Sequence, residues 1–191
     1  VHLCHHNLET IETTPTTKHD LLAEVCLAAK YEGESLKNYH AKYQENYKDY
    51  GSTICTVLAR SFADIGDIVR GKDPFYGNTH ESARRKQLDD KLKEIFKKIH
   101  NNLNNPEAKN YYNDNDKDKN FFKLREDWWT ANRSTVWKAI TCGAGQNDKY
   151  FRPTCGGNEK NSTLAKKQCR CDDKPNTDPP TYFDYVPQFL R

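Results

Sequence analysis

Residues 52–71 carry the most regular hydrophobic pattern in the chain. Apolar side chains recur there every three or four positions, which is the spacing of one face of an α-helix. They are Ile54, Val57, Leu58, Phe62, Ile65 and Ile68. A hydroxyl residue at position 52 or 53 can begin the helix, and Gly71 lies where helices favour a glycine after their last turn. The pattern predicts an amphipathic helix that buries Phe62 and Ile65.

The same spacing predicts a helix on each side of this one. The first begins at Asp20, an N-capping residue type, and ends at Gly51. Its apolar positions are Leu22, Val25, Cys26, Ala29, Leu36, Tyr39, Tyr43 and Tyr47. The other begins at Thr79 and ends within residues 101–106, with lysines opposite a heptad-like seam. That seam consists of Leu88, Leu92, Ile95, Phe96, Ile99 and Leu103.

A fourth helix is predicted over residues 121–141, where two apolar rows follow one another around the axis. One row is Leu124, Trp128, Ala131 and Thr135, and the other is Trp129, Val136 and Ile140. Because the rows lie on different sides, this helix is expected to be buried on more than one side. It is therefore the predicted central helix, with Trp128 and Trp129 in the core.

The remaining segments lack a helical period. Residues 1–17 are an irregular leading segment, and residues 104–120 are an insertion rich in Asn, Asp and Lys. Residues 142–180 hold four cysteines among glycines and prolines, which indicates a loop organised by disulfides. Residues 181–191 are expected to begin another helix. The predicted fold is all-α, a disulfide-linked helical bundle with long irregular loops.

The composition limits the functions that are open to this chain. Hydrophobic residues make up 35% and charged residues 30% of the 191 positions, and the mean hydropathy is −1.03, which predicts a thin core. The net charge of +3 is too balanced to indicate a nucleic-acid partner. No stretch approaches the roughly 18 consecutive apolar residues of a membrane helix, so no direct membrane insertion by this chain is expected. Since the sequence contains no Met, it is expected to be a piece of a longer protein.

Cysteine spacing favours disulfides in an oxidising compartment. The seven cysteines are Cys4, Cys26, Cys55, Cys142, Cys155, Cys169 and Cys171. Structural zinc sites usually contain two close pairs of ligands, and here only the last two cysteines are close. Because seven is odd, one cysteine is expected to pair outside the chain.

The order of the helices suggests a pairing. If four helices run alternately up and down, Cys26 and Cys142 lie at the same end of the bundle and are expected to form a bridge. A second bridge is expected within the loop that holds Cys155, Cys169 and Cys171. Either Cys4 or Cys55 would then find its partner elsewhere.

No residue pattern indicates catalysis. The imidazoles of His2, His5 and His6 surround Cys4, but neighbours on an extended chain point in opposite directions and cannot converge on a metal without help. No serine or cysteine lies in the context of an activated nucleophile. We therefore expect no enzyme, no catalytic residue, no metal and no cofactor, and a metal-dependent enzyme is kept only as a remote alternative.

Two basic clusters are candidates for binding a receptor or an acidic glycan. One lies on the polar side of the third predicted helix, and the other lies in the cysteine-rich loop. Their residues are Arg84, Arg85, Lys86, Lys91, Lys93, Lys97 and Lys98, and Lys166, Lys167 and Arg170. Several such cations can contact sulfate groups together through charge-assisted hydrogen bonds. The alternative is that interleaved charges only keep a helix face solvated.

Four sequence blocks are similar to a known family. They are residues 25–35 (VCLAAKYEGES), 54–68 (ICTVLARSFADIGDI), 124–133 (LREDWWTANR) and 182–191 (YFDYVPQFLR). Together they resemble the Duffy-binding-like alpha domain at the head of Plasmodium falciparum erythrocyte membrane protein one, and the blocks extend over nearly the whole chain.

The resemblance implies an all-helical fold of three subdomains, of which residues 1–17 would end the first and residues 18–191 would form the second. It further implies an extracellular module on the infected erythrocyte, part of a larger membrane-anchored protein that varies antigenically and mediates rosetting or adhesion to endothelium. The implied partners are a host receptor or sulfated glycosaminoglycan, neighbouring adhesion domains of the same polypeptide, and antibodies. The alternative is a structural spacer and antigenic shield. In either case the shared tryptophans are expected to pack in the core.

Overall fold

Helices dominate the part of the chain that the structure, a computed structural model, describes. That part comprises residues 18–47, 53–72, 79–113, 119–156, 162–171 and 178–191. The α-helices are α2 (Lys18–Tyr47), α3 (Ile54–Arg70), α4 (Thr79–Asn101), α5 (Pro106–Tyr111) and α6 (Phe122–Ile140). The short elements are β1 (Pro153–Cys155), β2 (Thr163–Leu164) and the 3-10 turns η1 (Phe183–Tyr185) and η2 (Gln188–Leu190). The all-α prediction is confirmed.

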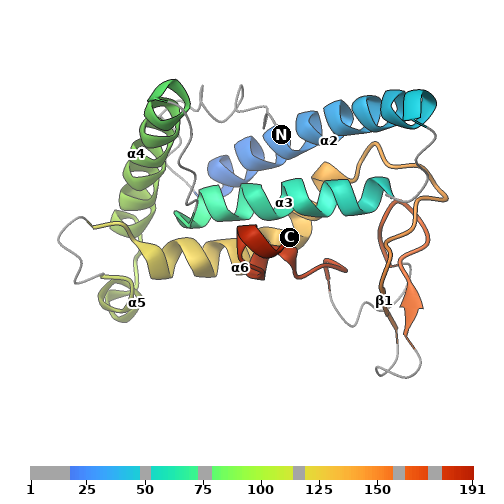
Figure 1. Cartoon of the computed structure of the whole chain (residues 1–191). Helices are drawn as coiled ribbons and strands as arrows, with labels where there is room; N and C mark the ends of the chain where they lie inside the picture. Colours follow the sequence, from blue (N-terminus) through green and yellow to red (C-terminus); the bar gives the residue numbers. More distant parts are fainter. Residues whose placement is uncertain (1–17, 48–52, 73–78, 114–118, 157–161, 172–177) are drawn as a thin grey trace.

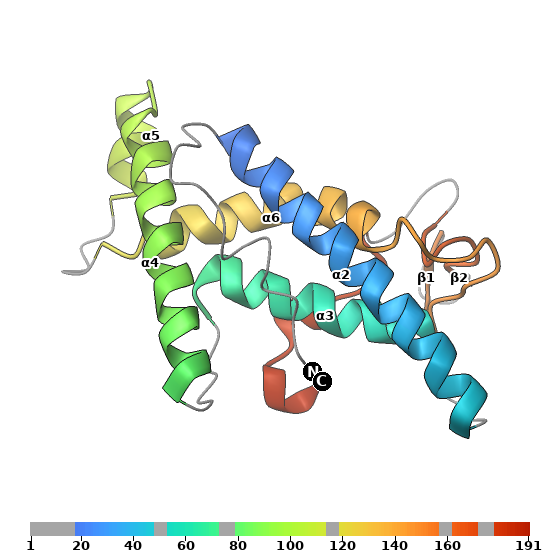
Figure 2. The ribbon, with the colours of Figure 1, turned by 90° about the horizontal axis from the view of Figure 1, so that it is seen from above.

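Helices α2, α3 and α6 pack side by side, and α4 crosses one end of the group (Figure 1). The view from above shows the same crossing (Figure 2). α2 and α6 run in the same direction, because the Trp128 indole donates a hydrogen bond to the Lys18 carbonyl at 3.4 Å near the start of both helices. Farther along, at the middle of α2 and the end of α6, a Cβ atom added to Gly33 would lie 2.1 Å from the Ile140 carbonyl oxygen. α3 runs in the opposite direction and packs against both of them (Figures 1 and 2).

α3 begins and ends as its sequence predicts. Thr53 is the N-cap residue, and Gly71 ends the helix with a φ of 70°, a left-handed conformation that costs glycine little. The backbone N–H of Gly71 donates to the Ile68 carbonyl at 3.1 Å. Phe62, fully buried, places its ring centroid 5.1 Å from that of Trp129 and 5.3 Å from that of Trp137. These rings form the centre of the core.

The predicted apolar row of α2 leaves the core before the helix ends. Leu21, Val25 and Ala29 are buried, but Tyr39 is 70% exposed. The reason is length: α2 has 30 residues, whereas α3 has 17, so the last turns of α2 pass the start of its neighbour.

One of the two rows expected on α6 is wrong in its second half. Ala131 and Thr135 are exposed, while Trp128 and Trp129 are buried. The buried positions that complete the helix are Arg125, Arg133 and Trp137. Two of these three are charged, so a search for apolar periodicity does not find them.

Residues 181–191 do not begin an α-helix as expected. They form the 3-10 turns η1 and η2, separated by Pro187, whose backbone lacks an N–H donor. The insertion expected at residues 104–120 contains the helix α5, and residues 114–118 lie outside the described part of the chain. The cysteine-rich loop holds the antiparallel pair β1–β2.

The disulfides agree with one of the expected pairings and contradict the others. Cys55 joins Cys169, so the expectation that Cys55 might seek a partner outside the chain is wrong. Within the loop, Cys155 joins Cys171, so the expectation of one bridge among Cys155, Cys169 and Cys171 is confirmed.

The predicted bridge between Cys26 and Cys142 is also wrong, because both cysteines are free. The premise of alternating directions fails: α4 crosses the other helices instead of returning beside them (Figure 1). α6 therefore runs parallel to α2, and Cys142 follows the end of α6, where Ile140 lies beside Gly33, about two helical turns farther along α2 than Cys26. Cys4 lies outside the described residues.

Candidate functional site

The basic residues of α4 form two rows instead of one face. A helix turns 100° per residue, so Arg84, Lys91 and Lys98 align along one row. Lys86, Lys93 and Lys97 align along another, about 140° away by the same arithmetic. The strip between the rows carries acidic side chains at positions 90 and 94. The positive charge is therefore interrupted, a feature that the sequence spacing already contains.

Ion pairs further reduce the charge available on α4. Lys93 pairs with Asp89 at 3.0 Å, and Lys98 lies 3.9 Å from Glu94. Arg84, Lys86 and Lys97 are exposed. Within the described part of the chain, those three cations show no ion pair.

A pocket of about 240 Å³ lies where α3 ends against α4. We call it the junction pocket; its lining residues are Ile68, Gly71, Ser82, Arg85, Lys86, Leu88 and Asp89. It brings two of the predicted binding residues, Arg85 and Lys86, to one cavity. Arg85 is half-buried, and burial lowers its pKa while the nearby Asp64 carboxylate raises it.

The guanidinium of Arg125 lies behind this pocket and is fully buried. Its Nε donates to the Val69 carbonyl at 2.6 Å, and its Nη2 donates to the Asp89 carboxylate at 3.0 Å. A Cβ atom added to Gly71 would meet its Nη1 at 3.0 Å. That Nη1 has no hydrogen-bond partner among the residues that the structure describes. Burial lowers the pKa of Arg125, and Asp89 opposes this shift.

The three residues of the second basic cluster do not have the same role: Arg170 bonds to the backbone and to a buried hydroxyl, whereas Lys166 and Lys167 are exposed. Arg170 donates from Nε to the Thr141 hydroxyl at 2.8 Å and from Nη2 to the Lys138 carbonyl at 2.6 Å. These bonds satisfy the C-terminal end of α6, where cations are favoured, so Arg170 is a structural residue. Lys166 and Lys167 are exposed. They belong to the loop near β1 and β2, at the opposite end of the molecule from α4, so the fold does not bring the two clusters together (Figure 1).

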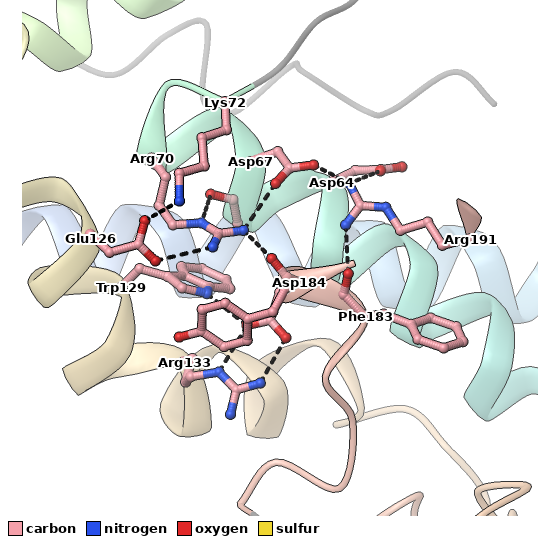
Figure 3. Close-up of polar contacts among 12 residues, drawn as sticks. Asp64, Asp67, Arg70, Lys72, Glu126, Trp129, Arg133, Phe183, Asp184 and Arg191 are labelled. Carbon is pink, nitrogen blue, oxygen red and sulfur yellow. Dashed lines mark hydrogen bonds and ion pairs between the residues drawn. The ribbon is translucent and has the colours of Figure 1, made fainter. Parts of the chain in front are cut away.

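Charged residues of three sequence blocks meet inside the protein in a cluster that the sequence reasoning missed (Figure 3). We call it the C-terminal clasp; it consists of Asp64, Asp67, Arg70, Arg133, Asp184 and Arg191. The Asp184 carboxylate, 1% exposed, accepts two bonds from Arg133, at 2.7 and 2.8 Å. It also accepts the indole N–H of Trp129 at 2.8 Å. A fork-to-fork pair of this kind fixes the segment 181–191 against α6.

The other half of the clasp holds the same segment to α3. The buried Arg70 guanidinium donates to Asp67 at 2.9 Å and also to the backbone carbonyl of Asp184. Arg191 pairs with Asp64 at 3.3 Å and with Asp67, and it donates to the Phe183 carbonyl at 2.8 Å. Burial raises the pKa values of Asp64 and Asp67, while the positive charge of Arg191 lowers them.

Glu126 and Lys72 extend these contacts toward the surface. Glu126 accepts a bond from Arg70 at 3.2 Å and pairs with Lys72. Burial alone would raise the pKa of Glu126, but the bonds and charges of Lys72 and Arg70 lower it overall. The charged side chains of the clasp pair with one another, and these pairs join α3 and α6 to residues 181–191. The sequence contains two hints of this site, which are the spacing of Trp129 and Arg133, four positions apart on α6, and that of Asp67 and Arg70, three positions apart on α3.

Within the described ranges, no group of three His, Cys, Asp or Glu side chains could hold a metal ion. His2, Cys4, His5 and His6 lie outside those ranges. No described helix is long and apolar enough to cross a membrane.

The model of the Duffy binding domain family matches residues 1–191. The chain belongs to this family. The family consists of adhesion domains and is not a known enzyme family. Among curated proteins, no sequence matches the chain.

Solved Duffy-binding-like domains share the fold. The NTS-DBL1(alpha-1) domain of Plasmodium falciparum membrane protein 1 (PfEMP1) from the varO strain is 43% identical, with a TM-score of 0.76. A double domain of NTS-DBL1-alpha and CIDR-gamma from the same strain is also 43% identical, with a TM-score of 0.77. The ICAM-1-binding DBLbeta domain of PfEMP1 IT4var13 is 28% identical, with a TM-score of 0.66. The matches cover 99% of this chain and 40%, 25% and 39% of those chains, respectively. The resemblance to the alpha domain is confirmed, and the chain spans two fifths or less of these relatives.

Proposed function

We propose that this Duffy-binding-like chain is an extracellular adhesion module of a variant antigen on the infected erythrocyte, and that it binds a host-cell receptor or sulfated glycan. The observation that supports this most is the division between interior and surface. The buried residues of the family blocks, among them Phe62, Trp129 and Asp184, form the centre of the core and part of the C-terminal clasp, and they hold the scaffold together. On the outside of α4, Arg84, Lys86 and Lys97 are exposed and form no ion pair with the residues that the structure describes.

Membership in the family supports the same proposal. A related domain has been solved in complex with ICAM-1, which is a property of that protein. The scaffold is common to both chains at a TM-score of 0.66. Surface residues that do not contribute to the stability of the fold can vary in sequence while the scaffold stays constant. The same division suits a spacer and antigenic shield, so a binding experiment must separate these two functions.

The experiment measures retention of the 191-residue chain on immobilised heparin and its binding to erythrocytes and endothelial cells. A triple variant, Arg84→Glu, Lys86→Glu and Lys97→Glu, reverses three exposed cations of α4. The matched control reverses exposed lysines elsewhere, at Lys30, Lys138 and Lys149. We expect the α4 variant alone to elute at lower salt and to lose cell binding, because charge-assisted contacts depend on local charge. A folded wild-type chain that binds neither heparin nor cells would instead establish the spacer.

A further inference from the structure

The second half of α2 presents tyrosines to solvent. Its last turns project past the start of α3 (Figure 2). Tyr31 is 52%, Tyr39 is 70% and Tyr43 is 39% exposed. Large rings in contact with water are unfavourable, and soluble proteins rarely gather several of them on one surface unless that surface has a partner. These rings therefore indicate an interaction surface.

The three rings lie on one side of the helix. Positions four apart are neighbours along a helix, so the side chains at 31, 35, 39 and 43 follow one another, and those at 38 and 42 adjoin them. We call this surface the tyrosine face; its exposed side chains are Tyr31, Ser35, Asn38, Tyr39, Lys42 and Tyr43. At 1.5 Å per residue it extends over about 18 Å.

The opposite side of the same turns faces the body of the protein. A pocket of about 440 Å³ lies between α2, the start of α3 and residues 147–149. The α2 residues that line it are Lys37, His40, Ala41 and Gln44. At 100° per residue, their mean direction is about 170° from that of the tyrosine face. The tyrosine face therefore points away from α3 and from this loop.

The composition of the tyrosine face is typical of surfaces that bind proteins. Tyrosine supplies a large contact area at a low cost in conformational entropy, and serine and asparagine supply adaptable hydrogen bonds. A helix face is also convex, whereas small ligands are bound in concave sites that enclose most of their surface. The partner of this face is therefore a macromolecule.

The charge of the face distinguishes between macromolecules. Within residues 31–43, all of which the structure describes, Lys42 is the only charged side chain exposed on this face. Glu32 lies on the same side but is buried, and it accepts a bond from the Ser61 hydroxyl at 3.1 Å. One cation attracts a polyanionic chain only weakly, because such attraction depends on many summed charges. A protein surface that carries a carboxylate complements a single lysine among tyrosines better.

We propose that the tyrosine face docks an acidic surface of a host-cell protein, with Tyr31 and Tyr39 as the main contacts and Lys42 paired with a carboxylate of that protein. This inference rests on the proposed adhesion function and deepens it, because it gives the receptor a chemical class and a place on α2. The exposed end of α2 and the cations of α4 lie at opposite ends of the molecule (Figure 1), so the two surfaces can be tested separately.

The test measures binding of the 191-residue chain to erythrocytes and endothelial cells by flow cytometry. The variants are Tyr31→Ala, Tyr39→Ala and Lys42→Glu, all at exposed positions, and circular dichroism checks that each is folded. Tyr111→Ala is the matched control for the tyrosines, because Tyr111 is 59% exposed but lies on α5, far from the end of α2 (Figure 1). Lys123→Glu, at an exposed position in the first turn of α6, is the control for the reversed charge.

We expect Tyr31→Ala and Tyr39→Ala each to weaken cell binding about tenfold, as truncation of a central interface tyrosine does. Lys42→Glu should weaken it by a similar factor, because like charges would then face each other. Both controls should change it less than about twofold. Tyr39→Ala removes no charge, so it should elute from immobilised heparin at the same salt concentration as the wild type.

Enzyme treatment of the cells tests the class of the partner. Trypsin, which removes surface proteins, should abolish the difference in binding between the wild type and Tyr39→Ala. Heparinase, which removes sulfated glycan, should leave the ratio of the two affinities unchanged, because contacts at separate sites contribute independently.

Four results overturn the assignment. The first is wild-type cell binding in both tyrosine variants, and the second is an equal loss in Tyr111→Ala. The third is a difference between the wild type and Tyr39→Ala that persists on trypsin-treated cells, which would indicate a glycan or lipid partner. The fourth is a wild-type chain that dimerises in sedimentation velocity while Tyr39→Ala stays monomeric, which would make a second copy the occupant. Where the chain still binds cells, the proposed function survives each of these results, whereas a folded chain that binds no cell would refute both proposals.

Discussion

Replacing Asp184 with Asn tests whether the C-terminal clasp stabilises the fold. The substitution keeps the shape of the side chain and removes its charge. Asp184 accepts two bonds from Arg133 and one from Trp129, and both partners are buried. The NH2 group of the substituted side chain would face the N–H donors of Arg133 or Trp129. Arg133 would also lose the only carboxylate that it pairs with among the described residues.

The magnitude follows from the burial of both partners. Breaking a buried ion pair by removing one member costs about 3–5 kcal/mol, because a buried charge is left unpaired. We expect the lower end, about 3 kcal/mol, since Arg133 keeps a bond of 2.8 Å to the Thr181 carbonyl. Small domains are stable by only about 5–15 kcal/mol, so this loss is large.

The assay is urea unfolding of the oxidised chain, followed by tryptophan fluorescence. Asp184→Asn should lower the midpoint with little change in slope. The control is Asp178→Asn, which removes an exposed carboxylate that accepts a single bond from Ser134 at 3.0 Å. It should remain within about 0.5 kcal/mol of the wild type. A similarly small effect of Asp184→Asn would refute the view that the clasp stabilises the scaffold.

Three further predictions concern the bridges, the carboxyls and one glycine. The double variant Cys55→Ser with Cys169→Ser removes a bridge that spans 114 residues, and Cys155→Ser with Cys171→Ser removes one that spans 16. The first should lower the thermal midpoint more, because a bridge across a longer loop confines the unfolded chain more. Equal losses in calorimetry would contradict this. Because burial raises the pKa of Asp64 above its ordinary 3.8, the native state holds that proton more tightly and loses stability as the pH rises above about 4. The urea midpoint of Asp64→Asn minus that of the wild type should therefore increase as the pH rises from about 4, and a decrease would contradict the direction of the pKa shift. Gly33→Ala should lower the free energy of unfolding by about 1–3 kcal/mol in thermal melts, because the added Cβ would lie 2.1 Å from the Ile140 carbonyl oxygen. This clash outweighs the better helix propensity of Ala. The control, Ser35→Ala on the exposed face of the same helix, should not lower it.

The helices were predictable because their signals are local. The apolar spacing of α3, its start at Thr53 and its end at Gly71 depend only on neighbouring residues, and the structure places them as expected. The resemblance carried by residues 54–68 and 124–133 likewise depends on sequence alone. The two rows of cations on α4 could also have been derived from helical geometry without coordinates.

Contacts between distant segments could be decided only by the tertiary structure. Whether Cys26 meets Cys142 depends on the relative direction of α2 and α6, and local spacing does not specify how α4 packs. The C-terminal clasp remained invisible for a related reason. Periodicity counts apolar positions, whereas Arg133 and Asp184 are buried only because each neutralises the other across 51 positions of sequence. A charge belongs in a protein core when its partner is there, and that partner is supplied by the fold.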